Sequence, residues 1–320
     1  MSITKWSKTE EQGYEVLQGE NAFICVRLVP ERGGKIISLV NKRTGTEWIH
    51  RTERPWTALR NGMNWDDGDQ GGWDEMFPTI EACSCPDEPW QDKRFPDHGE
   101  VWCMPWTYAI EGESLFLQVE GRQIPYRFGK RISLSGSELL LEYEVENPTR
   151  HLFSYLWAAH PLLNIRAGMK LEVPPSLNEI EIAYSHGERL GRLSDLNRFP
   201  LAEGRNGETV DLSILEEKDK NAGEKYYFTG KLQEGNVRLT DPMSGESMMY
   251  RFAPGEVPYL AIWAHYGAFG DYTFAVEPAT GYMDSVHRAH ELGKVKQVLP
   301  GGTNRWALRV ELGISRIKGN

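Results

Sequence analysis

The fold class is decided by residues 22–49, AFICVRLVPERGGKIISLVNKRTGTEWI. Two runs, 22–29 and 35–40, are rich in β-branched and aromatic residues, which favour strands. Between and after them lie 31–34 and 41–45, which carry the glycines and the asparagine typical of turns. The stretch therefore predicts a meander of short antiparallel strands.

The same pattern of short apolar runs and turns continues along the chain. Residues 101–158 contain five such runs, and LLLEYEVE at 139–146 ends in the alternation of a half-buried strand. A helix is expected only around Ser285–Leu292, ended by Gly293, and the polar residues 205–225 are expected to form an exposed loop. We therefore predict an all-β antiparallel sandwich or barrel, with residues 1–320 as a single domain.

Composition restricts the partners. The chain has 320 residues and a net charge of −10, with no run rich in Lys or Arg, so a nucleic-acid partner is not expected. No signal-peptide pattern and no run of 18 apolar residues is present, which predicts a cytoplasmic protein with no membrane partner. The four cysteines are expected to be reduced structural thiols. A monomer or a homodimer fits these features equally.

Tryptophan is concentrated in one part of the chain, between residues 48 and 106. The residues are Trp48, Trp56, Trp65, Trp73, Trp90, Trp102 and Trp106, seven of the eleven tryptophans. Carboxylates and glycines lie between them, as in WDDGDQGGWDE. An indole packs on the apolar face of a pyranose, and planar polar groups bind its hydroxyls, so the cluster as a whole predicts a sugar-binding surface. Any single tryptophan of the cluster can equally fill the core.

Three short segments place an ionisable group beside a turn or a strand end. They are FPDHGEVW with His98, LWAAHPLLN with His160, and FAVEPATG with Glu277. Both His160 and Glu277 precede a proline, which ends ladder pairing. A carboxylate at the end of a buried strand is costly unless it has a partner or a function. We therefore treat these three residues as the candidate catalytic group.

With these motifs in view, the chain resembles the aldose 1-epimerase (galactose mutarotase-like) superfamily over residues 20–315. The motifs that carry the resemblance occur in the family's order: GGKIISL at 33–39, Gly71-Gly72, Phe77-Pro78, His98-Gly99, His160-Pro161 with Asn164, Glu277-Pro278, and Leu299-Pro300-Gly301-Gly302. The resemblance implies a galactose mutarotase-like β-supersandwich of antiparallel strands with an open groove. It also implies acid–base catalysis without a metal or an organic cofactor, and no set of residues at metal-ligand spacing was found in the sequence.

The resemblance further implies roles for the three residues. Glu277 would remove the proton from the O1 hydroxyl of a small-molecule carbohydrate, His160 would protonate the ring oxygen O5, and His98 would orient the sugar. Ring opening, rotation about C1–C2 and closure then interconvert the anomers. Gln70, Trp73, Asp74 and Trp157 are expected to bind the substrate.

Two departures from the family bear on the substrate. Hexose-phosphate relatives carry an arginine where Gln70 stands, and the acidic residues Asp74 and Glu75 follow, which favours a neutral sugar over a phosphorylated one. Family members also use an acidic residue on a strand in the third quarter, whereas the matching stretch 223–227 has no clear aspartate.

Three functions stay open at this point. The first is a mutarotase acting on a free neutral aldose, and the second is a non-catalytic carbohydrate-binding module. The third is a carbohydrate hydrolase or lyase on the same fold, which would need two carboxylates flanking the scissile bond, such as Glu277 with Asp74 or Glu75. The sugar and the pathway are not specified by the sequence.

Overall fold

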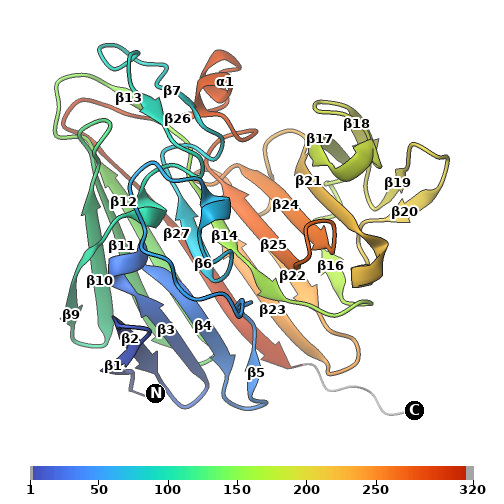
Figure 1. Ribbon diagram of the computed structural model, residues 1–320, viewed down its shortest axis with the longest axis horizontal. Coiled ribbons are helices and arrows are strands. Elements are labelled where there is room, and N and C mark those ends of the chain that lie inside the picture. The colour runs from blue at the N-terminus through green and yellow to red at the C-terminus, as the bar shows by residue number, and fades with distance from the viewer. Residues whose placement is uncertain (1–2, 315–320) are drawn as a thin grey trace.

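Two large antiparallel sheets form the protein. The computed structural model describes residues 3–314, and within them the strands account for 48% and one α-helix is present. This confirms the predicted all-β class. Figure 1 shows the large sheet in front, with its central strands β14, β25 and β24 beside one another.

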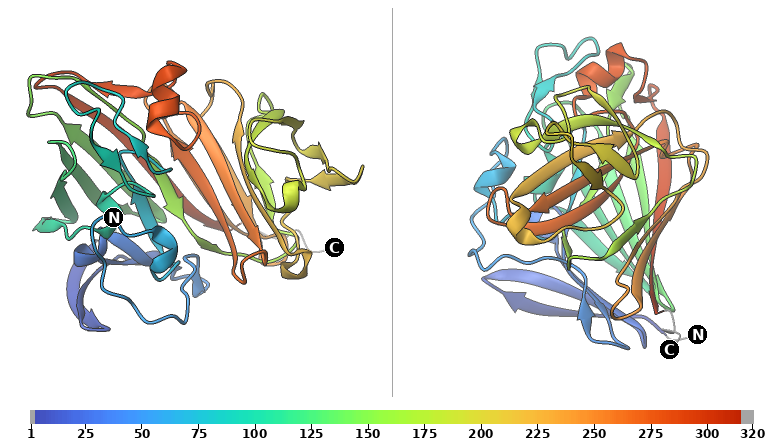
Figure 2. Two further views of the ribbon diagram at one scale, coloured as in Figure 1. Left: turned by 45° about the horizontal axis from the view of Figure 1, so that its top comes forward. Right: turned by 90° about the vertical axis from the view of Figure 1, so that its right-hand side faces the viewer.

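In the described chain the first sheet has 13 strands. Its path is β1 (Lys5–Glu11), β2 (Tyr14–Glu20), β3 (Ile24–Val29), β4 (Lys35–Asn41), β6 (Trp73–Met76), β14 (Ala158–Pro161), β25 (Tyr272–Ala279), β24 (Tyr259–Tyr266), β21 (Ala222–Phe228), β17 (Glu179–Ser185) and β18 (Leu196–Arg198), with β15 (Leu163–Asn164) on β25 and β5 (Thr46–Glu47) on β4. The N-terminal strands and β17–β18 therefore lie at opposite ends of this sheet, as Figures 1 and 2 show.

The second sheet, counted over residues 3–314, has eight strands. Its order is β16 (Lys170–Glu172), β22 (Asn236–Thr240), β23 (Glu246–Phe252), β27 (Thr303–Ile314), β12 (Glu138–Glu146), β11 (Arg127–Ser135), β10 (Ser114–Glu120) and β9 (Thr107–Glu111). Three short pairs complete the strands: β13 (Phe153–Tyr155) with β26 (Lys296–Val298), β19 (Leu201–Glu203) with β20 (Thr209–Asp211), and β7 (Cys83–Ser84) with β8 (Arg94–Phe95).

The helical elements are short. The helix α1 (Val286–Glu291) begins at Ser285, whose side chain accepts a hydrogen bond from the backbone N–H of Arg288, and Gly293 follows it with a φ of 65°. This agrees with the predicted helix. Among residues 3–314, five 3₁₀ turns connect other elements: η1 (Pro30–Arg32), η2 (Trp65–Asp67), η3 (Val101–Cys103), η4 (His186–Glu188) and η5 (Lys218–Lys220). None of the helices in the described part of the chain is long and apolar enough to cross a membrane.

One continuous apolar core lies between the two sheets. It includes residues from Leu17 near one end of the described chain to Leu312 near the other. Inward-facing side chains of β11, β12 and β27, such as Phe128, Tyr143 and Trp306, pack on one another with ring centroids 5.6–6.2 Å apart. Burial of this apolar surface stabilises the sandwich.

Two sequence predictions differ from the structure. The first of the five apolar runs predicted within 101–158, residues 101–110, was expected to be one strand, but η3 occupies Val101–Cys103 and β9 begins only at Thr107, after Pro105. The loop expected at 205–225 contains β20 and ends at Asn221, because β21 starts at Ala222 with every residue buried. The four cysteines are unpaired.

Candidate active site

Four neighbouring strands present their side chains on one face of the large sheet. In the register, Glu277 of β25 pairs with Ala261 of β24, and Lys225 of β21 pairs with Trp263 of β24. Since cross-strand partners point to the same face and alternate residues share it, Glu277, Trp263 and Lys225 lie together. Ala158 of β14 pairs with Ala279 of β25, so His160 shares this face too.

Glu277 is fully buried, and its carboxylate faces a lysine. The distance from its Oε2 to Nζ of Lys225 is 3.1 Å, and the same Nζ lies 3.0 Å from Oδ1 of Asp284. Tyr227 donates a hydrogen bond of 2.8 Å to Asp284. Burial raises the pKa of Glu277 above its ordinary value, and Lys225 opposes this shift. For Lys225, burial opposes the charge, but Asp284 and Glu277 outweigh it and raise the lysine pKa.

His160 lies on the other side of the Glu277 carboxylate. Its Nε2 is 3.9 Å from Oε1 of Glu277. Burial, together with the positive charges of His98 and Lys225, holds the pKa of His160 well below its ordinary value. The imidazole is therefore neutral at neutral pH.

His98 is held by the turn that carries it. It has a φ of 58°, and its backbone N–H donates to the carbonyl of Ile80 at 2.6 Å. Gly99 follows at a φ of 69° with its Cα against the backbone of Phe77, where a Cβ would lie 2.0 Å from the Phe77 carbonyl oxygen. Nδ1 of His98 lies 3.0 Å from Oδ2 of Asp97. Burial alone would raise the pKa of Asp97, but His98 reverses this and lowers it.

Trp65, in the turn η2, joins the two histidines. Its ring stacks on His98 with centroids 5.0 Å apart and meets His160 edge to face at 5.1 Å. The turn is fixed because the Trp65 backbone N–H donates to Asp97 and the indole N–H donates to Asp74, at 3.1 Å and 3.0 Å. Trp65 thereby forms an aromatic wall beside the ionisable groups.

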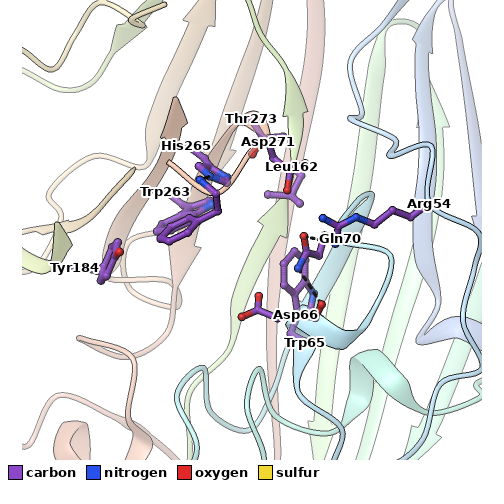
Figure 3. Close-up of a pocket in the computed structure, with 11 residues that line it drawn as sticks. Arg54, Trp65, Asp66, Gln70, Leu162, Tyr184, Trp263, His265, Asp271 and Thr273 are labelled. Atoms are coloured by element: carbon purple, nitrogen blue, oxygen red, sulfur yellow. Dashed lines mark hydrogen bonds between the residues drawn. The ribbon is translucent and has the colours of Figure 1, made fainter. Parts of the chain in front are cut away.

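These groups line a pocket of about 270 Å³, named here the catalytic pocket. It is lined by Trp65, Asp66, Ile80, Glu81, Asp97, His98, His160, Lys225, Trp263, Glu277 and Asp284. A second pocket of about 420 Å³, the side pocket, shares Trp65, Asp66 and Trp263 with it. Figure 3 shows the side pocket, with Trp65, Asp66 and Gln70 opposite Trp263 and His265.

The structure brings the three predicted catalytic residues into the catalytic pocket, although they lie far apart in sequence. Gln70, one of the four predicted binding residues, lines the side pocket, where its Oε1 accepts a hydrogen bond of 2.7 Å from Arg54.

The other three predicted binding residues lie elsewhere. Trp73 and Trp157 have no exposed surface, and the Trp157 indole donates to Glu75 at 2.9 Å. Asp74 lies beneath Trp65, with its Oδ2 3.3 Å from Nζ of Lys35. The expectation that these three residues touch the sugar is therefore corrected, because they line neither pocket. Trp73 and Trp157 belong to the core, whereas Asp74 lies on the face of His160 but is covered by Trp65.

Most of the tryptophan cluster is structural. Trp48, Trp73, Trp90, Trp102 and Trp106 are buried, and Trp56 lies over Arg32 near Tyr14. Trp65 is the member of the cluster that lines the two pockets. The density of tryptophan in this segment therefore mainly reflects core filling, and one member of the cluster lines the pockets.

Sequence reasoning missed Lys225, Trp263 and Asp284. Lys225 lies at the end of a charged stretch, so it was read as part of an exposed loop. The signal that identifies it is the run AGEKYYF at 222–228, in which strand alternation places residue 225 on the same face as residue 227. Lys225 also lies within residues 223–227, the stretch in which the family resemblance implied an acidic residue.

Comparisons with known proteins agree with this architecture. Residues 3–91 match the model of a domain of unknown function, DUF5107. No curated protein matches the chain.

Solved structures match nearly the whole chain. A galactose mutarotase-like protein from Lactobacillus casei ATCC 334 has 18% identity and a TM-score of 0.66, over 97% of this chain and 100% of its own. A candidate aldose 1-epimerase from Escherichia coli K12 has 15% identity and a TM-score of 0.67, over 98% and 100%. The Slr1438 protein from Synechocystis sp. PCC 6803 has 16% identity and a TM-score of 0.69, over 97% and 96%.

The chain has the galactose mutarotase-like fold. This confirms the family resemblance at the level of fold. At these identities the comparison carries the architecture alone, so the chemistry must be argued from the site.

Proposed function

We propose that the protein is an aldose 1-epimerase, an isomerase that interconverts the α and β anomers of a neutral aldose with a free anomeric carbon. The observation that carries this proposal is the facing pair of Glu277 and His160, 3.9 Å apart, at the base of a pocket with an aromatic wall. One group of the pair can take a proton while the other gives one, which is the requirement for opening a hemiacetal ring.

In the proposed mechanism Glu277 is the base. The carboxylate removes the O1 proton, and Lys225 keeps the carboxylate ionised despite its burial. Electrons of the O1–H bond form the C1=O carbonyl as the C1–O5 bond breaks, and O5 receives a proton from the histidine side of the pocket. Rotation about C1–C2 and closure on the other face of the carbonyl give the other anomer, and both protons return to their donors.

The acid is assigned to His160, with His98 orienting the sugar. His160 lies nearest to Glu277, and because its pKa is low, only a small fraction of the imidazole carries the proton at neutral pH, but that fraction is a strong acid. A second candidate for the acid is His98, which also lines the catalytic pocket and whose Nδ1 lies 3.0 Å from Oδ2 of Asp97.

The charges of the two pockets favour a neutral sugar. Six acidic side chains line them, namely Asp66, Glu81, Asp97, Asp271, Glu277 and Asp284, against two basic ones, Arg54 and Lys225. Lys225 is already paired with two carboxylates. Such a site disfavours an added phosphate dianion.

The hydrolase alternative has less support. The carboxylates expected to pair with Glu277 were Asp74 and Glu75, and both are engaged by buried partners outside the pockets. A single-domain organisation, a cytoplasmic location and a monomer or homodimer remain predictions.

Polarimetry on freshly dissolved pure α-anomers of a panel of neutral aldoses tests the proposed function. We expect the protein to accelerate the approach to anomeric equilibrium for at least one sugar, in proportion to protein concentration. Binding of a sugar without any acceleration across the panel would identify a carbohydrate-binding module instead.

A further inference from the structure

The side pocket adjoins the catalytic pocket. A single sugar ring bound in the catalytic pocket would not fill the side pocket. The two share Trp65, Asp66 and Trp263, and the side pocket is the larger, at about 420 Å³. A ligand bound at Glu277 can therefore extend into the side pocket past Trp263 without entering the core.

One wall of the side pocket is a platform of aromatic rings. Tyr184 of β17 lies 6.1 Å from Trp263 and 6.2 Å from Phe269 between ring centroids, and His265 lies 5.2 Å from Phe269. Tyr184 is 38% exposed and Phe269 is 54% exposed, which is unusual for large rings so near one another.

The platform is held in place by the backbone. The turn after β24 carries Phe269 between Gly267 and Gly270, whose φ values are 92° and 96°. The backbone N–H of Phe269 donates to Nε2 of His265 at 3.0 Å. This hydrogen bond fixes both the turn and the imidazole, so the aromatic surface is preorganised for a ligand.

The remaining walls are polar. Arg54 and Gln70 lie across from the rings in Figure 3, joined by their 2.7 Å hydrogen bond, and Asp271 and Thr273 also line the space. Aromatic faces opposed by planar donors and acceptors suit a pyranose, whose faces carry C–H groups and whose rim carries hydroxyls.

We infer that the side pocket binds a second sugar ring, so that the substrates are reducing disaccharides or longer reducing oligosaccharides. This inference rests on the proposed function, because it places the reducing-end ring at Glu277. The second ring must be linked through a hydroxyl other than O1, since the reaction requires a free O1 hydroxyl on the reducing ring. Its faces stack on Tyr184, Trp263 and Phe269, and its hydroxyls meet Arg54 and Gln70.

Titration calorimetry on the full chain tests the inference by comparing reducing disaccharides, 1→4 and 1→6 linked, with their own reducing-end monosaccharides. We expect at least one disaccharide to bind about tenfold or more tightly than its monosaccharide. Phe269→Ala and Tyr184→Ala should each reduce that advantage by about two- to tenfold, the usual contribution of one aromatic contact, and should leave monosaccharide binding unchanged. Phe23→Ala, which removes an exposed ring elsewhere, is the matched control.

Equal affinity for every disaccharide and its monosaccharide would overturn the inference, as would a loss of both affinities in Phe269→Ala. Anomer interconversion is measured separately on the same sugars. A disaccharide preference that depends on Phe269 without interconversion would refute the proposed function and retain the side-pocket assignment. Interconversion of monosaccharides without any disaccharide preference would refute the side-pocket assignment and retain the proposed function.

Discussion

Glu75 and Glu277 are both fully buried carboxylates on the large sheet, but their surroundings differ. Glu75 of β6 accepts from Lys130 and Tyr143 at 3.1 Å and 2.9 Å, and from the Trp157 indole at 2.9 Å. Glu277 of β25 has Lys225 on one oxygen, while the other oxygen faces His160 at 3.9 Å, beside the pocket. A carboxylate whose oxygens are both hydrogen-bonded to buried protein groups holds the sheets together. A carboxylate with one oxygen facing a pocket can act on a ligand.

The difference follows from the face of the sheet on which each residue lies. Ala159 pairs with Glu75 and His160 pairs with Asp74, so Glu75 points away from the face that carries His160. It points toward the second sheet, where Lys130 of β11 and Tyr143 of β12 meet it. Glu277 points to the opposite face, where it lines the catalytic pocket together with Trp65 and His98.

The largest effect is expected from the histidines. His160→Asn should lower the rate of anomer interconversion about 10²–10⁴-fold, because it removes the proposed acid while keeping a hydrogen-bonding side chain. His98→Asn should cost less. Exchange NMR measures both, with the exposed His151→Asn as control. A larger loss of rate in His98→Asn than in His160→Asn would identify His98, and not His160, as the general acid.

The next effect concerns stability and is specific to Glu75. Glu75→Ala leaves the Lys130 ammonium buried without its carboxylate, which should lower the free energy of unfolding by about 3–5 kcal/mol. Glu277→Gln should cost much less, since Lys225 keeps Asp284. Urea unfolding followed by tryptophan fluorescence measures both. Equal losses of unfolding free energy in the two variants would contradict the distinction between a structural Glu75 and a functional Glu277.

Lys225→Met should shift the pH dependence of catalysis. Glu277 must be ionised to act as the base, so activity is present above its pKa and is lost as the pH falls through it. Burial already raises that pKa, and removing Lys225 should raise it further, moving the acid limb of kcat/KM upward by about 1–3 pH units. Lys225→Arg should keep the wild-type limb. An acid limb that does not move in Lys225→Met would show that Lys225 does not support the base.

The smallest effect is on substrate charge. A 6-phosphate should bind less tightly than its neutral parent sugar, by on the order of tenfold at low salt, with the difference shrinking as salt is added. Titration calorimetry at two ionic strengths gives both values. Tighter binding of the phosphate would mean that Arg54 and Lys225 dominate the pocket.

Much of the fold was predictable from local sequence. The β-branched runs separated by turns, and the Ser285–Gly293 helix signals, identified the elements because they depend on neighbouring residues alone. The convergence of His98, His160 and Glu277 was expected from motif order. The positions of Trp73 and Trp157 were not predictable, because a short strand does not reveal which of its alternating side chains faces the groove. The position of Asp74 was not predictable because it depends on the turn that places Trp65 over it.

Lys225 and Trp263 were missed for a related reason. Their meeting with Glu277 depends on the pairing of β21, β24 and β25, which are separated along the chain by loops whose lengths do not fix the register. A charged residue after a polar stretch gives the same local signal whether it is solvated or buried beside a carboxylate.

The most direct test of the account is the rate of anomer exchange in Glu277→Gln, measured by two-dimensional exchange NMR on a sugar that the wild-type protein interconverts. Because the amide keeps the shape of the side chain but cannot take the O1 proton, we predict that sugar affinity stays within about threefold while kcat falls about 10²–10⁴-fold. Glu75→Gln, which changes the other buried carboxylate, should retain anomer exchange in its folded fraction. Full exchange activity in Glu277→Gln would contradict the proposed base and, with it, the functional distinction between the two glutamates.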